Sequence, residues 1–182
     1  MEVSLQEVAR YMRMGTSVPD GALAVRMETL LAEVQACLRP ARVWRRVSID
    51  GDLRGLGILA GCRDAYLVCG TLGAGVDALM RRVAVTSGAD ALIVQAAGTA
   101  LIERYMDAVE DEIRAELAPG ESLRMRFSPG YGDFPLEAQR MIFTELDAPR
   151  RVGVSLTDTL LMAPSKSVSA VIGVEPAKGA NA

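Results

Sequence analysis

Apolar residues recur at helical spacing through the first forty positions of the chain. Residues 4–7 (Ser-Leu-Gln-Glu) have the form of a capping box, and apolar residues follow at intervals of three and four. This pattern predicts a helix from Leu5 that ends in the segment 15–19. A second apolar stripe comprises Leu23, Met27, Leu30, Leu31, Val34 and Leu38. It begins after Asp20, which can cap a helix, and Pro40 closes it.

Alternation of apolar and polar positions predicts strands farther along the chain. Residues 41–49 alternate, with Val43, Val47 and Ile49 on one face, and a turn signal follows. The compact apolar run 65–69 predicts a buried strand, whereas residues 54–61 carry no clear pattern. Two later runs, 152–156 and 168–174, predict further strands, with polar and loop-forming residues between them. At least one hairpin-like pair is therefore expected near the end of the chain.

A Gly-rich segment, Gly70-Thr71-Leu72-Gly73-Ala74-Gly75, joins the buried strand to a helix predicted over residues 76–85. Strand, Gly-rich loop and helix is an arrangement that can bind phosphate. The glycine spacing, however, matches neither the dinucleotide fingerprint nor a P-loop, and no lysine follows. A tight strand-to-helix turn is the favoured interpretation, and a nucleotide-binding fold is rejected.

The longest helical pattern runs from Ser87 to about Leu117. Its small residues Ala96, Ala97, Gly98 and Ala100 permit close backbone packing, which predicts that the helix lies against the sheet. Glu103 and Asp107 are four residues apart and share one face of this helix. From spacing alone, a mid-helix glutamate is interpreted as solvated.

Residues 123–127 alternate like a strand and are followed by the turn-forming pair Pro129-Gly130. The apolar pattern of residues 136–146 then predicts a short helix that Asp133 could cap. Arg126 is thus expected at the end of a strand, beside a Gly-rich loop. These features make residues 123–146 the segment around which a binding site is sought.

A guanidinium at such a bend, next to Tyr131, suits a planar anionic group beside a flat ring. The alternative interpretation is structural, with Arg126 in a strand-end ion pair and Tyr131 packed on the core. Taken together, the predicted elements indicate an α+β fold: one domain over residues 1–182, with a mostly antiparallel twisted sheet packed with helices. The tail 176–182 is expected to be frayed.

Composition narrows the function classes. Half of the residues are hydrophobic and the net charge is −3 with no basic run, so a nucleic-acid surface is not expected. The chain has no histidine, which excludes a Ser-His-Asp triad and any His-ligated metal. Its three cysteines form no CxxC pair, and neither a signal peptide nor a membrane span is recognised. A cytoplasmic protein with reduced thiols is therefore expected.

Five segments, in order, resemble the activation (reactivation) domain of cobalamin-dependent methionine synthase in its short stand-alone form. They are residues 67–77, 102–107, 126–131, 152–162 and 163–170. The most specific is Arg126-Phe127-Ser128-Pro129-Gly130-Tyr131, which is similar to the family signature Arg-x-x-x-Gly-Tyr. The resemblance implies an α+β fold of the methionine synthase activation domain type.

The resemblance also implies a function. A domain of this family binds S-adenosylmethionine and docks over cobalamin held by a partner protein, a cobalamin-dependent methyltransferase. An electron from a flavodoxin-like reductant and a methyl group from S-adenosylmethionine then restore methylcobalamin from cob(II)alamin. This chain would accordingly be an accessory protein for reactivation, with no turnover in isolation.

The residue roles follow from the same resemblance. Arg126 would hold the methionine carboxylate of S-adenosylmethionine, and Glu103 would face its amino group, with Asp107 a neighbouring candidate. Gly130 would let the backbone approach the ligand, and Tyr131 would pack beside it. Backbone groups of Ser128 and Pro129 would meet the adenine edge.

Two departures from the family pattern support an alternative function. An acidic Asp-Trp-Thr-Pro segment has no counterpart here, and the positions of a family aromatic pair are occupied by Ile172 and Gly173. The alternative is a non-catalytic docking module for corrinoid proteins that has lost S-adenosylmethionine binding. Lys166, in the loop before the last strand, is expected to be a solvated turn lysine.

Overall fold

Two long central strands, β2 (Asp64–Thr71) and β6 (Ser167–Glu175), organise the fold of the computed structural model, which describes residues 1–15 and 19–176. They pair antiparallel, and β1 (Ala41–Ser48) and β3 (Ser122–Leu123) flank them to give the sheet order β1-β2-β6-β3. All three pairings are antiparallel, so the predicted α+β class with a mostly antiparallel sheet is confirmed. The first helix, predicted to end within residues 15–19, ends earlier, at Tyr11, with Met12 as its C-cap. Residues 16–18 and 177–182 lie outside the described residues, so the expected fraying of the tail 176–182 stays a prediction.

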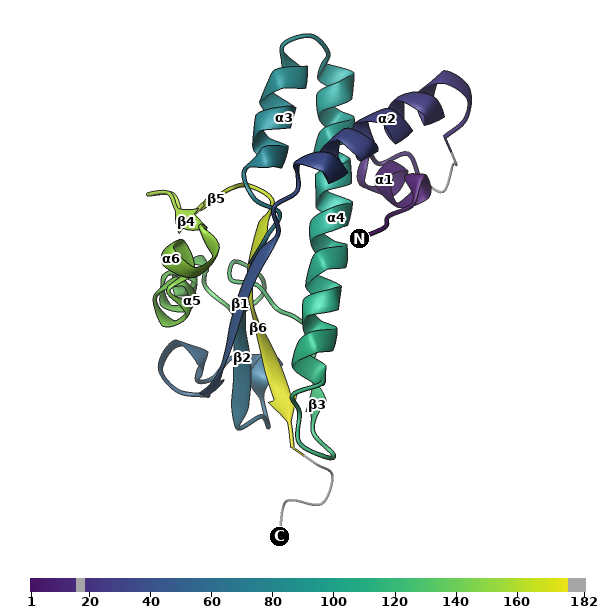
Figure 1. The fold of residues 1–182 in the computed structure, drawn as a ribbon. Helices are drawn as coiled ribbons and strands as arrows, with labels where there is room; N and C mark the ends of the chain where they lie inside the picture. The colour runs from purple at the N-terminus through teal and green to yellow at the C-terminus, as the bar shows by residue number, and fades with distance from the viewer. Residues whose placement is uncertain (16–18, 177–182) are drawn as a thin grey trace.

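Helices cover both faces of this sheet (Figure 1). The helices α1 (Leu5–Tyr11), α2 (Gly21–Cys37), α3 (Gly75–Ala84) and α4 (Gly88–Arg114) lie to one side, and α5 (Gln139–Leu146) and α6 (Ala148–Val152) lie to the other. Alternate residues of β2 point to opposite faces. Tyr66 and Val68 join the core beneath α4, whereas Leu67 and Cys69 join the core beneath α5. The sheet therefore separates two hydrophobic cores.

The helix α4 contacts β2 and β6 of the sheet, as predicted, and it also packs on α1, α2 and α3. Ala96, Ala97 and Ala100 are buried along α4. On the sheet side, a Cβ atom at Gly70 would collide with the sulfur of Met106. The helix ends at Arg114, three residues before the predicted end at Leu117.

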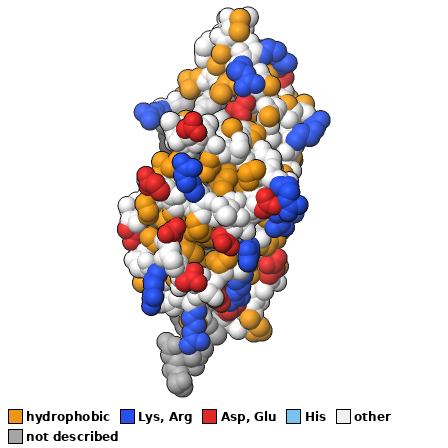
Figure 2. Space-filling view, turned by 90° about the vertical axis from the view of Figure 1, so that its left-hand side faces the viewer, with side chains coloured by type: hydrophobic (Ala, Val, Ile, Leu, Met, Phe, Trp, Pro, Cys, Tyr) orange, Lys and Arg blue, Asp and Glu red, His pale blue; other side chains and the backbone are white. Residues whose placement is uncertain are grey.

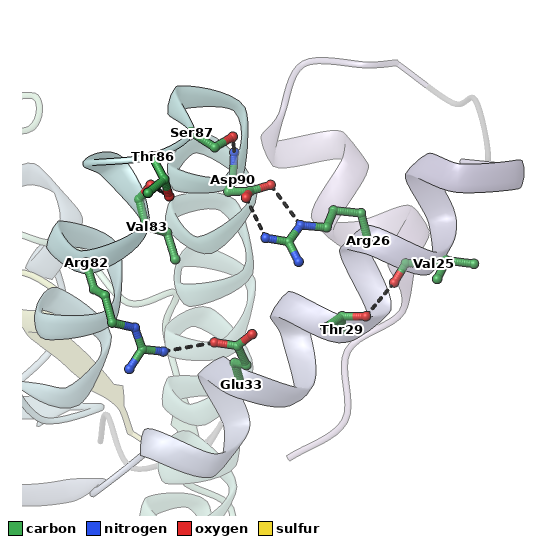
Figure 3. A network of polar contacts seen from close by, with 9 residues as sticks. All are labelled: Val25, Arg26, Thr29, Glu33, Arg82, Val83, Thr86, Ser87 and Asp90. Atoms are coloured by element: carbon green, nitrogen blue, oxygen red, sulfur yellow. Dashed lines mark hydrogen bonds and ion pairs between the residues drawn. The ribbon is translucent and has the colours of Figure 1, made fainter.

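The N-terminal helices are attached to α3 and α4 by the core and by exposed ion pairs. The predicted capping box of α1 is confirmed, since Glu7 N donates to Ser4 Oγ over 3.1 Å. Figure 3 shows Arg26 of α2 reaching Asp90 of α4, with Nη2 and Oδ2 2.5 Å apart. Water screens ion pairs that are exposed in this way, so they add little to stability. The buried apolar contacts of the core therefore account for most of the attachment.

Several short helices and strands complete the fold. They are the 3-10 helices η1 (Gly51–Leu53), η2 (Gly57–Leu59) and η3 (Leu136–Ala138) and the hairpin of β4 (Ser155–Leu156) and β5 (Met162–Ala163). The hairpin confirms the expected strand pair near the end. The strand predicted at 152–156 is wrong in its first half, because α6 includes Val152 and Gly153 then turns left-handed with φ 68°.

The strand predicted at 123–127 is also mostly wrong. β3 pairs only with the end of β6, and beyond it Phe127 forms a single bridge to Val171. The outer edge of β6 from Ser167 to Ala170 consequently has no strand partner within the described residues. The candidate site described below lies along this open edge.

The surface shows no charge of one sign gathered on the face that carries α5 and α6. Figure 2 shows Lys and Arg side chains interspersed there with Asp and Glu, around hydrophobic side chains in the middle of that face. Among the described residues, no helix is both long and apolar enough to cross a membrane.

Candidate functional site

A cavity of about 990 Å³ lies along the open edge of β6. Acidic side chains of α4 line one side of it, the segment after β3 lines another, and the β4–β5 hairpin lines a third. Five of the six predicted site residues are among its lining residues: Glu103, Arg126, Ser128, Pro129 and Tyr131. The fold therefore brings α4 and the Arg126 segment together around one space.

Gly130, the sixth predicted residue, shapes the turn without lining the cavity. Its φ angle of 92° is one that a side chain disfavours, and its N–H donates to Phe134 O over 2.8 Å. Phe134 is buried beneath the turn and stacks on Phe127, with ring centroids 6.3 Å apart. The turn is thus supported from below by two aromatic rings, one of which also lines the cavity.

Asp133 does not cap the helix that follows the turn, contrary to the sequence prediction. Its carboxylate instead accepts a hydrogen bond of 2.6 Å from Gly57 N. The helical segment begins as η3 after Pro135, which has no side-chain cap. Asp133 therefore ties the loop of the site to η2.

Arg126 is ion-paired with carboxylates of α4. Its Nη2 lies 2.8 Å from Glu103 Oε2 and 3.6 Å from Asp107 Oδ1, and its Nη1 donates to Glu110 Oε1. Only 13% of the Arg126 side chain is exposed. The ion pair of the structural alternative is therefore present, although Arg126 lies beyond the end of β3 at Leu123.

Glu110 is a site residue that the sequence interpretation missed. It lies seven residues after Glu103 on the same face of α4, and its side chain is 17% exposed. Burial raises the pKa of Glu110, and the Arg126 guanidinium opposes that rise. The spacing 103, 107, 110 was the available signal, but only the fold shows that this face meets an arginine.

Three carboxylates and one guanidinium give this end of the cavity a net negative character. A guanidinium can hold a carboxylate through two parallel hydrogen bonds, while carboxylates attract ammonium or sulfonium groups. The arrangement therefore suits a ligand that carries a carboxylate together with at least one positive charge. An amino acid with an additional cationic centre has this chemistry.

Tyr131 stands at the rim of the cavity, with 68% of its surface exposed. The alternative that it packs on the core is therefore wrong. Leu161 and Met125 are further exposed apolar residues that line the same cavity. The entrance thus combines an aromatic ring with apolar side chains.

Lys166 is buried, which corrects the expectation of a solvated lysine. It is 5% exposed, and its Nζ donates to Thr99 Oγ1 over 3.1 Å. Its stem crosses α4 at Gly98, where a Cβ atom would lie 2.9 Å from Lys166 Cε. Burial lowers the pKa of Lys166, while Asp77 acts in the opposite direction. The loop before β6 is therefore anchored to α4.

Two polar residues at the back of the cavity are also buried. Ser169 Oγ has no hydrogen-bond partner within the described residues, although the residue lines the cavity. Gln139 Nε2 donates to the carbonyl of Leu160 over 3.2 Å, and Leu160 has a left-handed φ of 63°. An unsatisfied buried hydroxyl is costly, which makes Ser169 a candidate for contact with a bound molecule.

The two positions that depart from the family aromatic pair leave no room for a ring. Ile172 is fully buried in the core beneath α4. A Cβ atom at Gly173 would lie 3.0 Å from both Cys62 Sγ and Leu59 Cδ2. Any aromatic contact with a ligand must therefore come from Tyr131 or Phe127.

Comparisons with known proteins point to one family. The model of the family described as vitamin B12 dependent methionine synthase, activation domain, matches residues 69–179. One solved structure, described as the MetH reactivation domain bound to AdoHcy, shares the fold with a TM-score of 0.67 and 18% sequence identity. That match covers 97% of this chain and 78% of the other. A comparison with curated proteins finds no match.

Proposed function

The chain belongs to the family of vitamin B12-dependent methionine synthase activation domains, and from this premise we propose that it binds S-adenosylmethionine in the cavity beside β6. There it would serve the reductive remethylation of cobalamin held by a separate methionine synthase or corrinoid methyltransferase. The single observation that carries the proposal is the placement of Arg126 against three carboxylates in a cavity of about 990 Å³.

The charges of the cavity match those of S-adenosylmethionine. The ligand has a carboxylate, an ammonium and a sulfonium, so one guanidinium and several carboxylates complement it. Arg126 would hold the carboxylate and Glu103 would take the ammonium, with Asp107 next to it. Tyr131 and Phe127 offer ring faces for the adenine. The bound ligand supplies the methyl group, and the residues named here hold and orient it.

Cobalamin would remain with the partner protein. The chain has no histidine that could ligate cobalt. The exposed apolar residues Met125, Tyr131 and Leu161 line the cavity, so a protein carrying a corrinoid could cover them. A flavodoxin-like reductant is the proposed electron source, as the family resemblance implies.

Isothermal titration with S-adenosylmethionine tests the binding step. Wild-type protein is expected to bind. Arg126→Ala is expected to lose roughly 2–5 kcal/mol of binding free energy, because the charged pair of the ligand carboxylate with a largely buried guanidinium is removed. Arg114→Ala is the matched control, since Arg114 is exposed on α4 and, among the described residues, forms an ion pair with Asp111 alone. No heat from wild type at millimolar ligand would refute the proposal.

A second candidate function is a docking module that does not bind S-adenosylmethionine. The lack of room for an aromatic side chain at Gly173, where a Cβ atom would lie 3.0 Å from both Cys62 Sγ and Leu59 Cδ2, favours it. Pull-down with a corrinoid methyltransferase, with and without S-adenosylmethionine, separates the two functions. Complex formation that ignores the ligand, together with absent heat in the titration, would favour the docking module.

A further inference from the structure

Arg126 has two hydrogen-bonded carboxylate partners of unequal exposure. Glu110 accepts a hydrogen bond from Nη1, and its side chain is 17% exposed. Glu103 accepts one from Nη2, and its side chain is 45% exposed. A carboxylate that leaves a buried partner loses more interaction energy than one at the surface, since water screens and solvates the exposed group. Glu103 is therefore the partner that exchanges more readily.

Release of Glu103 would free one edge of the guanidinium. The Nε of Arg126 makes no hydrogen bond to any described residue, and Nη2 would become available once Glu103 turns away. Two adjacent N–H groups on one edge can hold a carboxylate through parallel hydrogen bonds. Glu110 can stay on Nη1, on the far side of the guanidinium, throughout this exchange.

We propose that Glu110 is a positioning residue for the amino-acid end of the ligand, and that it keeps the Nε–Nη2 edge of Arg126 directed at the ligand carboxylate while Glu103 moves to the ligand ammonium. The inference rests on the proposed binding of S-adenosylmethionine. It adds a residue for which the resemblance implied no role. Glu110 contacts the ligand only through Arg126.

Without the charge of Glu110, Arg126 would turn fully to the other acidic groups of α4. Asp107 Oδ1 already lies 3.6 Å from Nη2, and Glu103 is in hydrogen-bond contact. The guanidinium would then occupy the two carboxylates that the ligand ammonium needs. Neutralising Glu110 thus weakens both the contact of Arg126 with the ligand carboxylate and the contact of the α4 carboxylates with the ligand ammonium.

The opposite expectation is that Glu110 competes with the ligand. A carboxylate already on the guanidinium could act as an internal substitute for the ligand carboxylate, and its removal would then tighten binding. The two accounts predict changes of opposite sign for the same variant, Glu110→Gln, which keeps the shape of the side chain and removes its charge.

The test measures dissociation constants of wild type, Glu110→Gln and Asp111→Asn for S-adenosylmethionine and for 5′-methylthioadenosine, a nucleoside thioether without the amino-acid end. Asp111 is the matched control, because it is the next residue of α4 and pairs with the exposed Arg114. Glu110→Gln is expected to weaken S-adenosylmethionine binding on the order of tenfold, as for loss of one charged hydrogen bond. The nucleoside affinity should not change, and Asp111→Asn should match wild type for both ligands.

Several results would overturn the inference. Unchanged or tighter S-adenosylmethionine binding by Glu110→Gln would show that Glu110 does not position Arg126. Equal weakening of both ligands would indicate a general disturbance of the cavity. Absence of S-adenosylmethionine binding by wild type would overturn the proposed function, and this inference with it. A thermal melt of each variant verifies that it is folded.

Discussion

Replacement of Arg126 by methionine should destabilise the protein even without a ligand. Arg126 and Glu110 retain only 13% and 17% exposure, so the variant leaves a largely buried carboxylate without its partner. Breaking a buried pair from one side costs 3–5 kcal/mol, and the residual exposure places this pair near the lower limit, at about 3 kcal/mol. The exposed partner Glu103 adds less than about 1 kcal/mol.

Urea unfolding at pH 7, followed by circular dichroism, measures this loss in the free energy of unfolding. For a chain of this length, about 3 kcal/mol corresponds to roughly 6–12 °C in Tm. The double variant Arg126→Met/Glu110→Gln should be less destabilised than the sum of the single changes, because it removes the stranded charge. A single variant within about 0.5 kcal/mol of wild type would refute the reasoning.

The pH dependence of this difference has a definite sign. Burial raises the pKa of Glu110 in the folded protein, and Arg126 limits the rise. Without Arg126 the folded-state pKa rises further, so the cost of the charged carboxylate is present above that pKa and disappears as the pH falls through it. The gap between wild type and Arg126→Met should therefore narrow on acidification from pH 7. A gap that widens would contradict the assignment.

Three further changes give separate tests. Lys166→Met should raise the free energy of unfolding at pH 7, because burial lowers the pKa of a lysine whose Nζ, among the described residues, has the Thr99 hydroxyl as its sole hydrogen-bond partner. This gain should shrink as the pH rises from the lowered folded-state pKa towards the unfolded value of about 10, and urea unfolding across this range checks both effects. Gly70→Ala should cost about 1–3 kcal/mol in the same assay, since the new Cβ meets the sulfur of Met106; an unchanged midpoint would show that α4 can move aside. Tyr131→Ala should leave Tm within about 1–2 °C, because the ring is 68% exposed, yet weaken S-adenosylmethionine binding by about 1 kcal/mol in calorimetry; a large fall in Tm would assign the ring to the core.

Local signals in the sequence predicted much of the fold. The capping box at Ser4 and Glu7, the strand at residues 41–49 and the small-residue helix that became α4 all depend on nearby residues. Their hydrophobic periodicity and capping act over a few positions. The antiparallel α+β class followed from the order of these elements, and the structure confirms it.

The errors arose where contacts between distant residues decide the outcome. Asp133 resembles a helix cap locally, but its carboxylate bonds to the backbone of Gly57. Lys166 resembles a turn lysine, but Gly98 opens space on α4 that accommodates its stem. The residues next to Asp133 and Lys166 in the sequence do not indicate that Gly57 and Gly98 are their partners. Both side chains belong to the loops that surround the site.

The candidate site shows the same division. Arg126, Tyr131 and Glu103 were selected by resemblance to a family signature, and the fold places all three around one cavity. Glu110 was missed because its importance comes from the partner it meets across the cavity. That partner follows the chain reversal after α4, and helix spacing alone does not predict the contact.

The most direct measurement is a crystal structure of the wild-type protein grown with S-adenosylmethionine. The account predicts the ligand in the cavity beside β6, with its carboxylate on Arg126, its ammonium at Glu103, and Glu110 still bound to the guanidinium. A cavity without ligand at saturating concentration, with Arg126 still held by both Glu103 and Glu110, would contradict it.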